Sequence, residues 1–295
     1  TKHMALAIWD VLDRKKDRAI YTETKEGFIE ELTPDAQETP LDSLLTPELY
    51  LNALGKIKRR AASDDAGWRE RVDARKAATR HLGDNVEFLT GLIQHFNRQI
   101  DRDSTDLQTI TIDKIGAQWR QALQMLEQNG IVDDLGEGRY CIPRAEGVHY
   151  LTGDWLEEYV WHAARDQGVE HAELSLKFDD LAHRKQGQNN EIDVFIVHRN
   201  RLLLVECKSG WMGRDGRKDG DIIYKLDSIG LHAGGTQATR LLVSAQSLQH
   251  ETREGRKVDT RARASATGIH TLEAGELKSI GTMIRQWKQS GQWQQ

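Results

Sequence analysis

Two apolar segments joined by a short polar turn constrain the fold more than any other feature of the sequence. Residues 191–197 and 202–208 are rich in the β-branched and aliphatic residues that favour strands. Arg199, Asn200 and Arg201 lie between them and are typical of a tight turn. The two segments are therefore predicted to pair as an antiparallel β-hairpin.

Charged residues interrupt this apolar hairpin at one end. Asp193 and Glu206 are nearly equidistant from the turn, so strand pairing brings their two carboxylates side by side. Side chains alternate along a strand, so Lys208 is expected on the same face as Glu206, whereas Cys207 points away. Asp193, Glu206 and Lys208 are the predicted catalytic core.

A divalent cation would relieve the repulsion between the two carboxylates, which otherwise raise each other's pKa. Oxygen ligands favour Mg²⁺ or Mn²⁺, and Mg²⁺ keeps several waters, which leaves room for a phosphate oxygen and an attacking hydroxide. The predicted metal-binding residues are Asp193, Glu206 and Cys207. Lys208 is expected either to hold the scissile phosphate or to orient and deprotonate the water, and both roles remain open.

A helix upstream of the hairpin offers a further acidic residue. Residues 154–164 show an apolar stripe at helical spacing, and Asp154 can cap the helix. In the first turn, Glu157 or Glu158 could reach the metal through water, and Glu157 is preferred as the fourth catalytic residue. The alternative is that both are solvated acids favoured by the helix dipole.

A chance pattern and other catalytic chemistries are the alternatives to this site. A Glu-x-Lys triplet is frequent, and on an exposed strand it would be a weak surface ion pair. Here the triplet ends a run of aliphatic residues and faces an acid on the preceding strand, which favours a catalytic site. The histidines and cysteines show no zinc-ligand spacing, and no Gly-x-Ser-x-Gly elbow is present for a serine nucleophile.

The remaining sequence predicts three regions. Residues 148–295 alternate helix and strand signals, which predicts an α/β domain. Residues 56–147 read as a helical connector: a charged helical stretch runs from Lys56 to Arg80, and a helix and hairpin that resemble a winged helix occupy residues 113–142. Residues 1–55 are too few to close a core alone.

The winged-helix-like unit has two interpretations. DNA recognition would require several phosphate contacts, whereas the helix offers only Lys114 and Arg120 as cations. A structural adaptor is therefore favoured.

Composition limits the partners and the cellular compartment that we expect. The formal net charge of −5 indicates that any contact to nucleic acid comes from local patches or metal ions. No apolar run approaches the roughly 18 residues of a membrane span, and two cysteines are too few for a disulfide framework. We expect a cytoplasmic protein without a membrane partner.

The motifs together resemble a known family. The segments 190–193 and 206–208, with 155–158 upstream, 224–226 beginning a helix downstream and Gly234-Gly235 after it, resemble the PD-(D/E)xK, restriction-endonuclease-like domain of CARF-domain nucleases of type III CRISPR systems. Lys225 of the downstream helix either meets the nucleic-acid backbone or is solvated.

The resemblance extends to the start of the chain. Residues 1–7 are similar to the second half of that family's signature for binding cyclic oligoadenylate, which implies that Thr1 and Lys2 contact this ligand. It also implies that residues 1–55 are the C-terminal remnant of a Rossmann-like CARF sensor domain, with the N-terminal part missing.

Two functions follow as expectations. The resemblance implies a homodimeric nuclease that cuts DNA or RNA with Mg²⁺ or Mn²⁺ in antiviral defence, after activation by cyclic oligoadenylate, in particular the tetramer. The alternative is a regulatory protein whose winged helix binds nucleic acid while the nuclease-like fold is a non-catalytic scaffold.

Overall fold

The structure is a computed structural model of the 295-residue chain. It describes residues 21–23, 28–31, 38–40, 43–104, 106–180, 190–212, 216–234, 238–251, 255 and 257–293. Three residues with predicted roles, Thr1, Lys2 and Gly235, lie outside the described residues.

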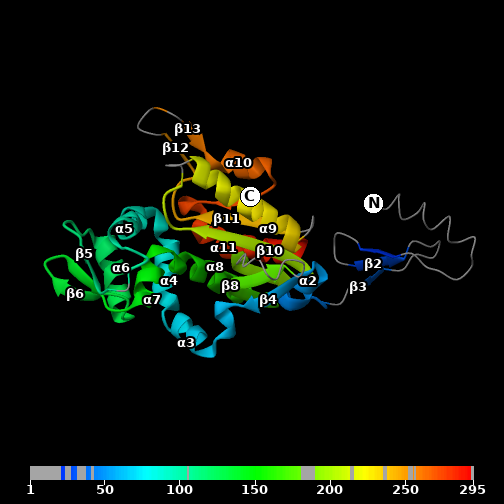
Figure 1. Cartoon of the computed structure of the whole chain (residues 1–295), viewed down its shortest axis with the longest axis horizontal. Coiled ribbons are helices and arrows are strands. Elements are labelled where there is room, and N and C mark those ends of the chain that lie inside the picture. Colours follow the sequence, from blue (N-terminus) through cyan, green and yellow to red (C-terminus); the bar gives the residue numbers. More distant parts are fainter. Residues whose placement is uncertain are drawn as a thin grey trace, which may run out of the picture.

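A mixed six-stranded sheet forms the centre of the molecule (Figure 1). Its strand order is β14-β11-β10-β9-β8-β4; β4, β8, β9 and β10 are antiparallel neighbours, and β10, β11 and β14 are parallel ones. The strands span Lys56–Arg60 (β4), His171–Asp180 (β8), Asn190–His198 (β9), Arg201–Lys208 (β10), Thr239–Ser244 (β11) and His270–Leu272 (β14). The expected α/β class is confirmed.

The predicted hairpin is β9–β10. Its register pairs Arg201 with His198 and continues to Val205 with Val194. Arg199 and Asn200 have φ values of 48° and 61°, as a tight two-residue turn between twisted strands requires. The hairpin therefore follows the expected register.

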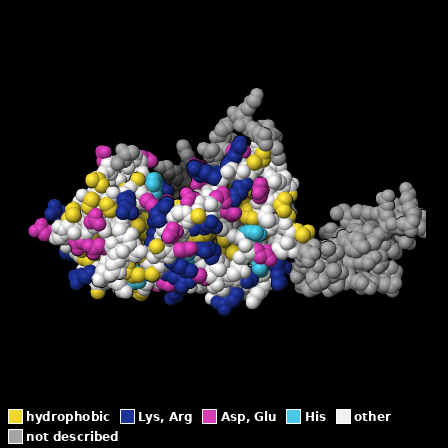
Figure 2. All heavy atoms as spheres, turned by 90° about the horizontal axis from the view of Figure 1, so that it is seen from below, with side chains coloured by type: hydrophobic (Ala, Val, Ile, Leu, Met, Phe, Trp, Pro, Cys, Tyr) yellow, Lys and Arg dark blue, Asp and Glu magenta, His cyan; other side chains and the backbone are white. Residues whose placement is uncertain are grey.

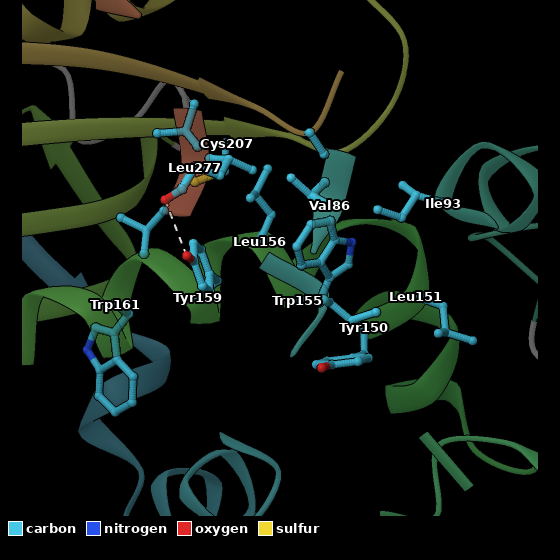
Figure 3. Close-up of a cluster of buried hydrophobic side chains, with 14 of the residues drawn as sticks. Val86, Ile93, Tyr150, Leu151, Trp155, Leu156, Tyr159, Trp161, Cys207 and Leu277 are labelled. Atoms are coloured by element: carbon cyan, nitrogen blue, oxygen red, sulfur yellow. Dashed lines mark hydrogen bonds between the residues drawn. The ribbon is translucent and has the colours of Figure 1, made fainter. Parts of the chain in front are cut away.

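Helices cover both faces of the sheet. One face packs on α2 (Pro47–Ala53), α9 (Gly216–Gly234) and α10 (Thr260–Ala266) in a cluster that includes Phe195 and Leu226. The other packs on α8 (Trp155–Asp166) and α11 (Ile280–Ser290), where Leu156, Cys207 and Leu277 lie together (Figure 3). Both faces of β9–β10 are thus buried.

The connector shares the second of these cores. It contains α3 (Ala66–Ala74), α4 (Lys76–Asp84), α5 (Val86–Gln99), α6 (Ala117–Gln128) and α7 (Ala145–His149), with a short turn at Ala62–Asp64 before α3 and a wide turn at Tyr150–Asp154 before α8. The strands β5 (Gln108–Thr111), β7 (Arg139–Ile142) and β6 (Asp133–Gly136) form a small antiparallel sheet beside α5 and α6, as a winged-helix-like unit would. The domain boundaries themselves stay a prediction.

Two further small antiparallel sheets are present. β1 (Tyr21–Glu23), β2 (Phe28–Glu31) and β3 (Glu38–Pro40) form one, and β12 (Gln249–Glu251) and β13 (Lys257–Asp259) form the other. Within the described residues, no helix is long and apolar enough to cross a membrane.

The prediction of a helical stretch from Lys56 to Arg80 is wrong for its first residues. Residues 56–60 form the edge strand β4 rather than helix, because their cations meet acids that the sequence does not place nearby. Lys56 Nζ lies 2.5 Å from Asp180, and Lys58 Nζ lies 3.0 Å from Glu173, both on the neighbouring strand β8. Cross-strand charge pairing thus stabilises a segment whose composition alone favours helix.

Two helix ends also differ from expectation. α9 begins at Gly216 rather than Tyr224, since the polar, glycine-containing first turns carry no apolar periodicity. Asp154 does not cap α8; its backbone is already helical, and its carboxylate accepts a hydrogen bond from Arg102 instead (2.8 Å).

A buried ion pair joins the connector to α8. Arg75 donates two hydrogen bonds to Glu158 (3.0 and 2.5 Å) and a third to Glu146 (2.5 Å). The side chains of Arg75 and Glu158 are only 7% and 1% exposed. Burial alone would lower the pKa of Arg75, but the two carboxylates outweigh burial and raise it. The expectation that Glu158 could be a solvated first-turn acid is therefore wrong.

Replacing Arg75 should strongly destabilise the fold. We expect Arg75→Ala to lower the free energy of unfolding at pH 8 by about 3–5 kcal/mol, because the buried Glu158 loses its partner and must either stay charged without a counter-ion or take up a proton. Arg71 is the matched control: it is half exposed and pairs with Glu146, so Arg71→Ala should cost about 1 kcal/mol or less. Urea denaturation measures both, and equal losses would contradict the buried-pair argument.

Candidate active site

Asp193 is a buried carboxylate at the end of the hairpin. Its Oδ2 accepts a hydrogen bond from the backbone N–H of Cys207 (2.6 Å) on the neighbouring strand β10. Burial and the nearby Glu206 raise the pKa of Asp193 to about 7. Asp193 and Glu206 thus lie close enough to repel, as the hairpin register predicts.

Two lysines neutralise Glu206. Lys208 Nζ lies 2.7 Å from Glu206 Oε1, which places both side chains on one face of β10. Lys225 Nζ approaches the same carboxylate from α9, at 3.4 and 3.5 Å from its two oxygens. Lys225 is 44% exposed, so it borders the site without being enclosed by it.

Lys208 stays protonated in this arrangement. Burial alone would lower the pKa of Lys208, but Glu206 and Asp193 outweigh burial and raise it above its usual value. Of the two roles that the sequence leaves open, this favours a cation that holds a phosphate oxygen over a base that deprotonates water.

Glu157 completes an acidic group with Asp193 and Glu206. Burial and the charge of Asp193 raise the pKa of Glu157 well above its usual value. Its neighbour Glu158 faces Arg75, so the two glutamates of the first turn of α8 point to different partners. The structure therefore brings Glu157, and not Glu158, together with Asp193.

The Cys207 side chain points to the opposite face of β10 from Glu206 and Lys208. Its thiol is buried in the apolar cluster with Leu156 and Leu277, near the hydrogen bond from Tyr159 to the Leu277 carbonyl (Figure 3). Burial raises the pKa of the Cys207 thiol well above its usual value, so the sulfur stays protonated. As a metal ligand, Cys207 is limited to its main-chain carbonyl oxygen.

Ser175 is a member of the site without a recognisable sequence signal. It lies in β8, and its Oγ donates a hydrogen bond to Oε2 of Glu157 (3.2 Å). The strand β8 itself was not expected, and a single serine in a strand gives no indication of a contact to a helix 18 residues upstream.

The site suits a hard cation that retains water. Among the described residues, no three His, Cys, Asp or Glu side chains already surround one point as metal ligands would. Mg²⁺ needs only one or two carboxylates and keeps several waters. Asp193 and Glu206 supply two, and a cation would replace the lysine contacts of Glu206 and the proton of Asp193. The donor set therefore fits Mg²⁺ or Mn²⁺.

Half of the chain matches a known protein family. A family model described as the Card1-like endonuclease domain matches residues 144–291, half of the chain. This range holds the whole acidic group, Lys208 and Ser175. The comparison with curated proteins gives no match.

Two solved structures share the fold. Protein VC1899 from Vibrio cholerae is 22% identical, with a TM-score of 0.75 over 100% of this chain and 75% of its own. Can2 from Sulfobacillus thermosulfidooxidans, solved in complex with cyclic tetra-adenylate, is 19% identical, with a TM-score of 0.68 over 98% of this chain and 73% of its own.

Metal affinity should depend on pH through Asp193. The ion competes with the proton of Asp193, whose pKa is about 7. We therefore expect the apparent Kd for Mn²⁺ to rise about tenfold for each pH unit below 7 and to level off above it. Calorimetric titration at pH 6, 7 and 8 measures this, and the same affinity at all three values would contradict it.

Proposed function

The chain belongs to the Card1-like endonuclease family, and from this premise we propose that it hydrolyses phosphodiester bonds of DNA or RNA with Mg²⁺ or Mn²⁺. The observation that carries the proposal is the convergence of Asp193, Glu206 and Lys208 at the end of one hairpin. Two carboxylates beside a protonated lysine combine metal ligands with a phosphate-binding cation.

Asp193 and Glu206 would hold the ion. When bound, the ion supplies a water of lowered pKa and offsets the charge that develops on the phosphate. Asp193 is fixed for this task by the N–H of Cys207, which orients one of its oxygens and leaves the other for a ligand. The Glu206 side chain is only 4% exposed, and the cation would take the place of its ionic contacts to Lys208 and Lys225.

Lys208 would hold a non-bridging oxygen of the scissile phosphate. Its position between Glu206 and Asp193 keeps it charged until substrate arrives, and a phosphate anion would take the place of a carboxylate contact. Lys225 lies on α9 and is more exposed, and it would contact a neighbouring phosphate of the nucleic-acid strand.

Glu157 would act on the attacking water. Its raised pKa, caused by burial and by Asp193, suits a group that exchanges a proton with water. Its carboxylate also receives the Ser175 hydroxyl, so one oxygen is held while the other remains for water. This role agrees with the choice of Glu157 over Glu158.

The surface supports contacts through a few local cations. On the face in Figure 2, basic and acidic side chains are interspersed, in keeping with a formal net charge of −5. Binding of nucleic acid would then depend on the metal and on Lys208 and Lys225 rather than on a broad basic field.

We further propose activation by a cyclic oligoadenylate, in particular cyclic tetra-adenylate, in type III CRISPR antiviral defence in the cytoplasm. The support is the similarity in fold to Can2, which was solved with cyclic tetra-adenylate, and the resemblance of residues 1–7 to a ligand-binding signature. Thr1 and Lys2 would contact the ligand across a homodimer interface.

The alternative, a DNA-binding regulator that uses the winged-helix-like unit, has less support. The wing strand β6 exposes Asp133 and Asp134, which would repel phosphates. The unit also packs its helices α5 and α6 into the connector core, as a structural adaptor does.

Substitution of the core residues tests the catalytic proposal. We expect Asp193→Ala, Glu206→Ala and Lys208→Ala each to lower kcat about 100-fold or more, because each removes several kcal/mol of transition-state stabilisation. Cleavage of plasmid, single-stranded DNA and RNA is followed with Mn²⁺ or with EDTA, with and without cyclic tetra-adenylate.

Asp179→Ala is the matched control. Asp179 lies on the same sheet, pairs with Arg59 and takes no part in the acidic group, so its loss should leave cleavage unchanged. Undiminished cutting by Asp193→Ala would refute the catalytic proposal. Equal cutting with and without cyclic tetra-adenylate would refute the activator alone.

A further inference from the structure

Ser175 has a backbone conformation that is unusual for a strand residue. Its φ is 48°, in the left-handed region, although it lies within the ten-residue strand β8. Residues other than glycine, asparagine and aspartate rarely adopt this region because Cβ crowds the following carbonyl. Such strain persists where the surroundings demand it, and it often marks a functional site.

The conformation reverses the alternation of side chains in β8. Leu174 and Leu176 should share a face because they are two residues apart. Instead, Leu174 packs in the core on the α8 face, and Leu176 packs in the core on the α9 face. The switch of faces occurs at Ser175, so the direction of its side chain is not set by the regular alternation of the strand.

The neighbouring strand β9 shows the same reversal at Asp193. Val194 and Ile192 are also two residues apart and also pack in opposite cores. The register pairs Leu174 with Val194 and Leu176 with Ile192, so Ser175 lies across from Asp193. The same row continues to Glu206, since Val194 pairs with Val205. Ser175, Asp193 and Glu206 therefore form one row across three strands.

The Ser175 hydroxyl faces the only other acid of the group. It donates a hydrogen bond to Oε2 of Glu157, a residue of α8. Ser175 also lines a cavity of about 810 Å³, together with Arg60, Trp68 and Arg71. Ser175 therefore contacts both Glu157 and a space large enough to hold water.

We propose that Ser175 is a positioning residue for Glu157. Its left-handed backbone directs the hydroxyl at one carboxylate oxygen and holds the other oxygen toward Asp193 and the attacking water. The role of Ser175 rests on the proposed nuclease function, in which Glu157 acts on that water. Ser175 would serve that function through Glu157, without touching the metal or the phosphate.

Three substitutions separate the hydroxyl from the backbone. Ser175→Ala removes the donor and keeps a side chain at positive φ, and Ser175→Gly removes the donor and relieves the crowding. Ser175→Asn keeps a donor and tolerates the left-handed region. We expect Ala and Gly variants to lose about tenfold in kcat with KM little changed, as loss of an orienting hydrogen bond does, and the Asn variant to recover most of it.

Stability is measured beside activity. Ser175→Gly should raise Tm by about 2 °C or more because it removes a strained residue, so its loss of kcat would not reflect unfolding. Ser63→Ala is the matched control: the Ser63 hydroxyl donates to Glu173 (2.6 Å) and accepts from the N–H of Leu174, beside the same strand but outside the acidic group. It should lower Tm and leave kcat unchanged.

The outcomes distinguish the two proposals. Wild-type kcat in Ser175→Gly, or equal losses in Ser175→Ala and Ser63→Ala, would overturn the role of Ser175 while leaving the nuclease function intact. Cleavage that survives Asp193→Ala would overturn the nuclease function and, with it, the role of Ser175.

Discussion

Burial of the β9–β10 hairpin on both faces is the constraint on which the rest of the structure depends. Val194, Ile196, Leu203 and Val205 face one helical layer, and Phe195, Val197, Leu202 and Leu204 face the other. Such a hairpin is stable only between two apolar layers, which α8 and α11 supply on one side and α2, α9 and α10 on the other. The charged side chains of β9 and β10 accordingly lie toward the ends of the strands.

The charges at that end balance one another across three layers. Asp193 and Glu206 come from the sheet, Glu157 from α8 and Lys225 from α9, so the acidic group is assembled by the same packing that buries the hairpin. Uncompensated, these acids would oppose folding. Lys208 and Lys225 neutralise Glu206, while a proton neutralises Asp193 near neutral pH. A cation could replace all three without disturbing the strands.

Rules that depend only on neighbouring residues are sufficient to predict the hairpin. Strand alternation and equal distance from the turn place Asp193, Glu206 and Lys208 together, and both depend only on residues 193–208. What the sequence misses depends on distant partners. The strand β4 is stabilised by Asp180 and Glu173, and Glu158 is buried by Arg75, 83 residues away. Ser175 escapes notice because its conformation breaks the two-residue period that predicts strands.

The connector holds the site at two points of the chain. Arg75 donates two hydrogen bonds to Glu158, the residue after Glu157. A shift of α3 and α4 would therefore move the start of α8. From α5, Gln94 donates to Gln246 (2.9 Å), which follows Ala245, whose N–H donates to the carbonyl of Lys208 (2.9 Å). Glu157 and Lys208 therefore lie next to residues that the connector fixes. Because packed cores shift between discrete arrangements rather than deform smoothly, a movement of the connector would alter both catalytic groups together.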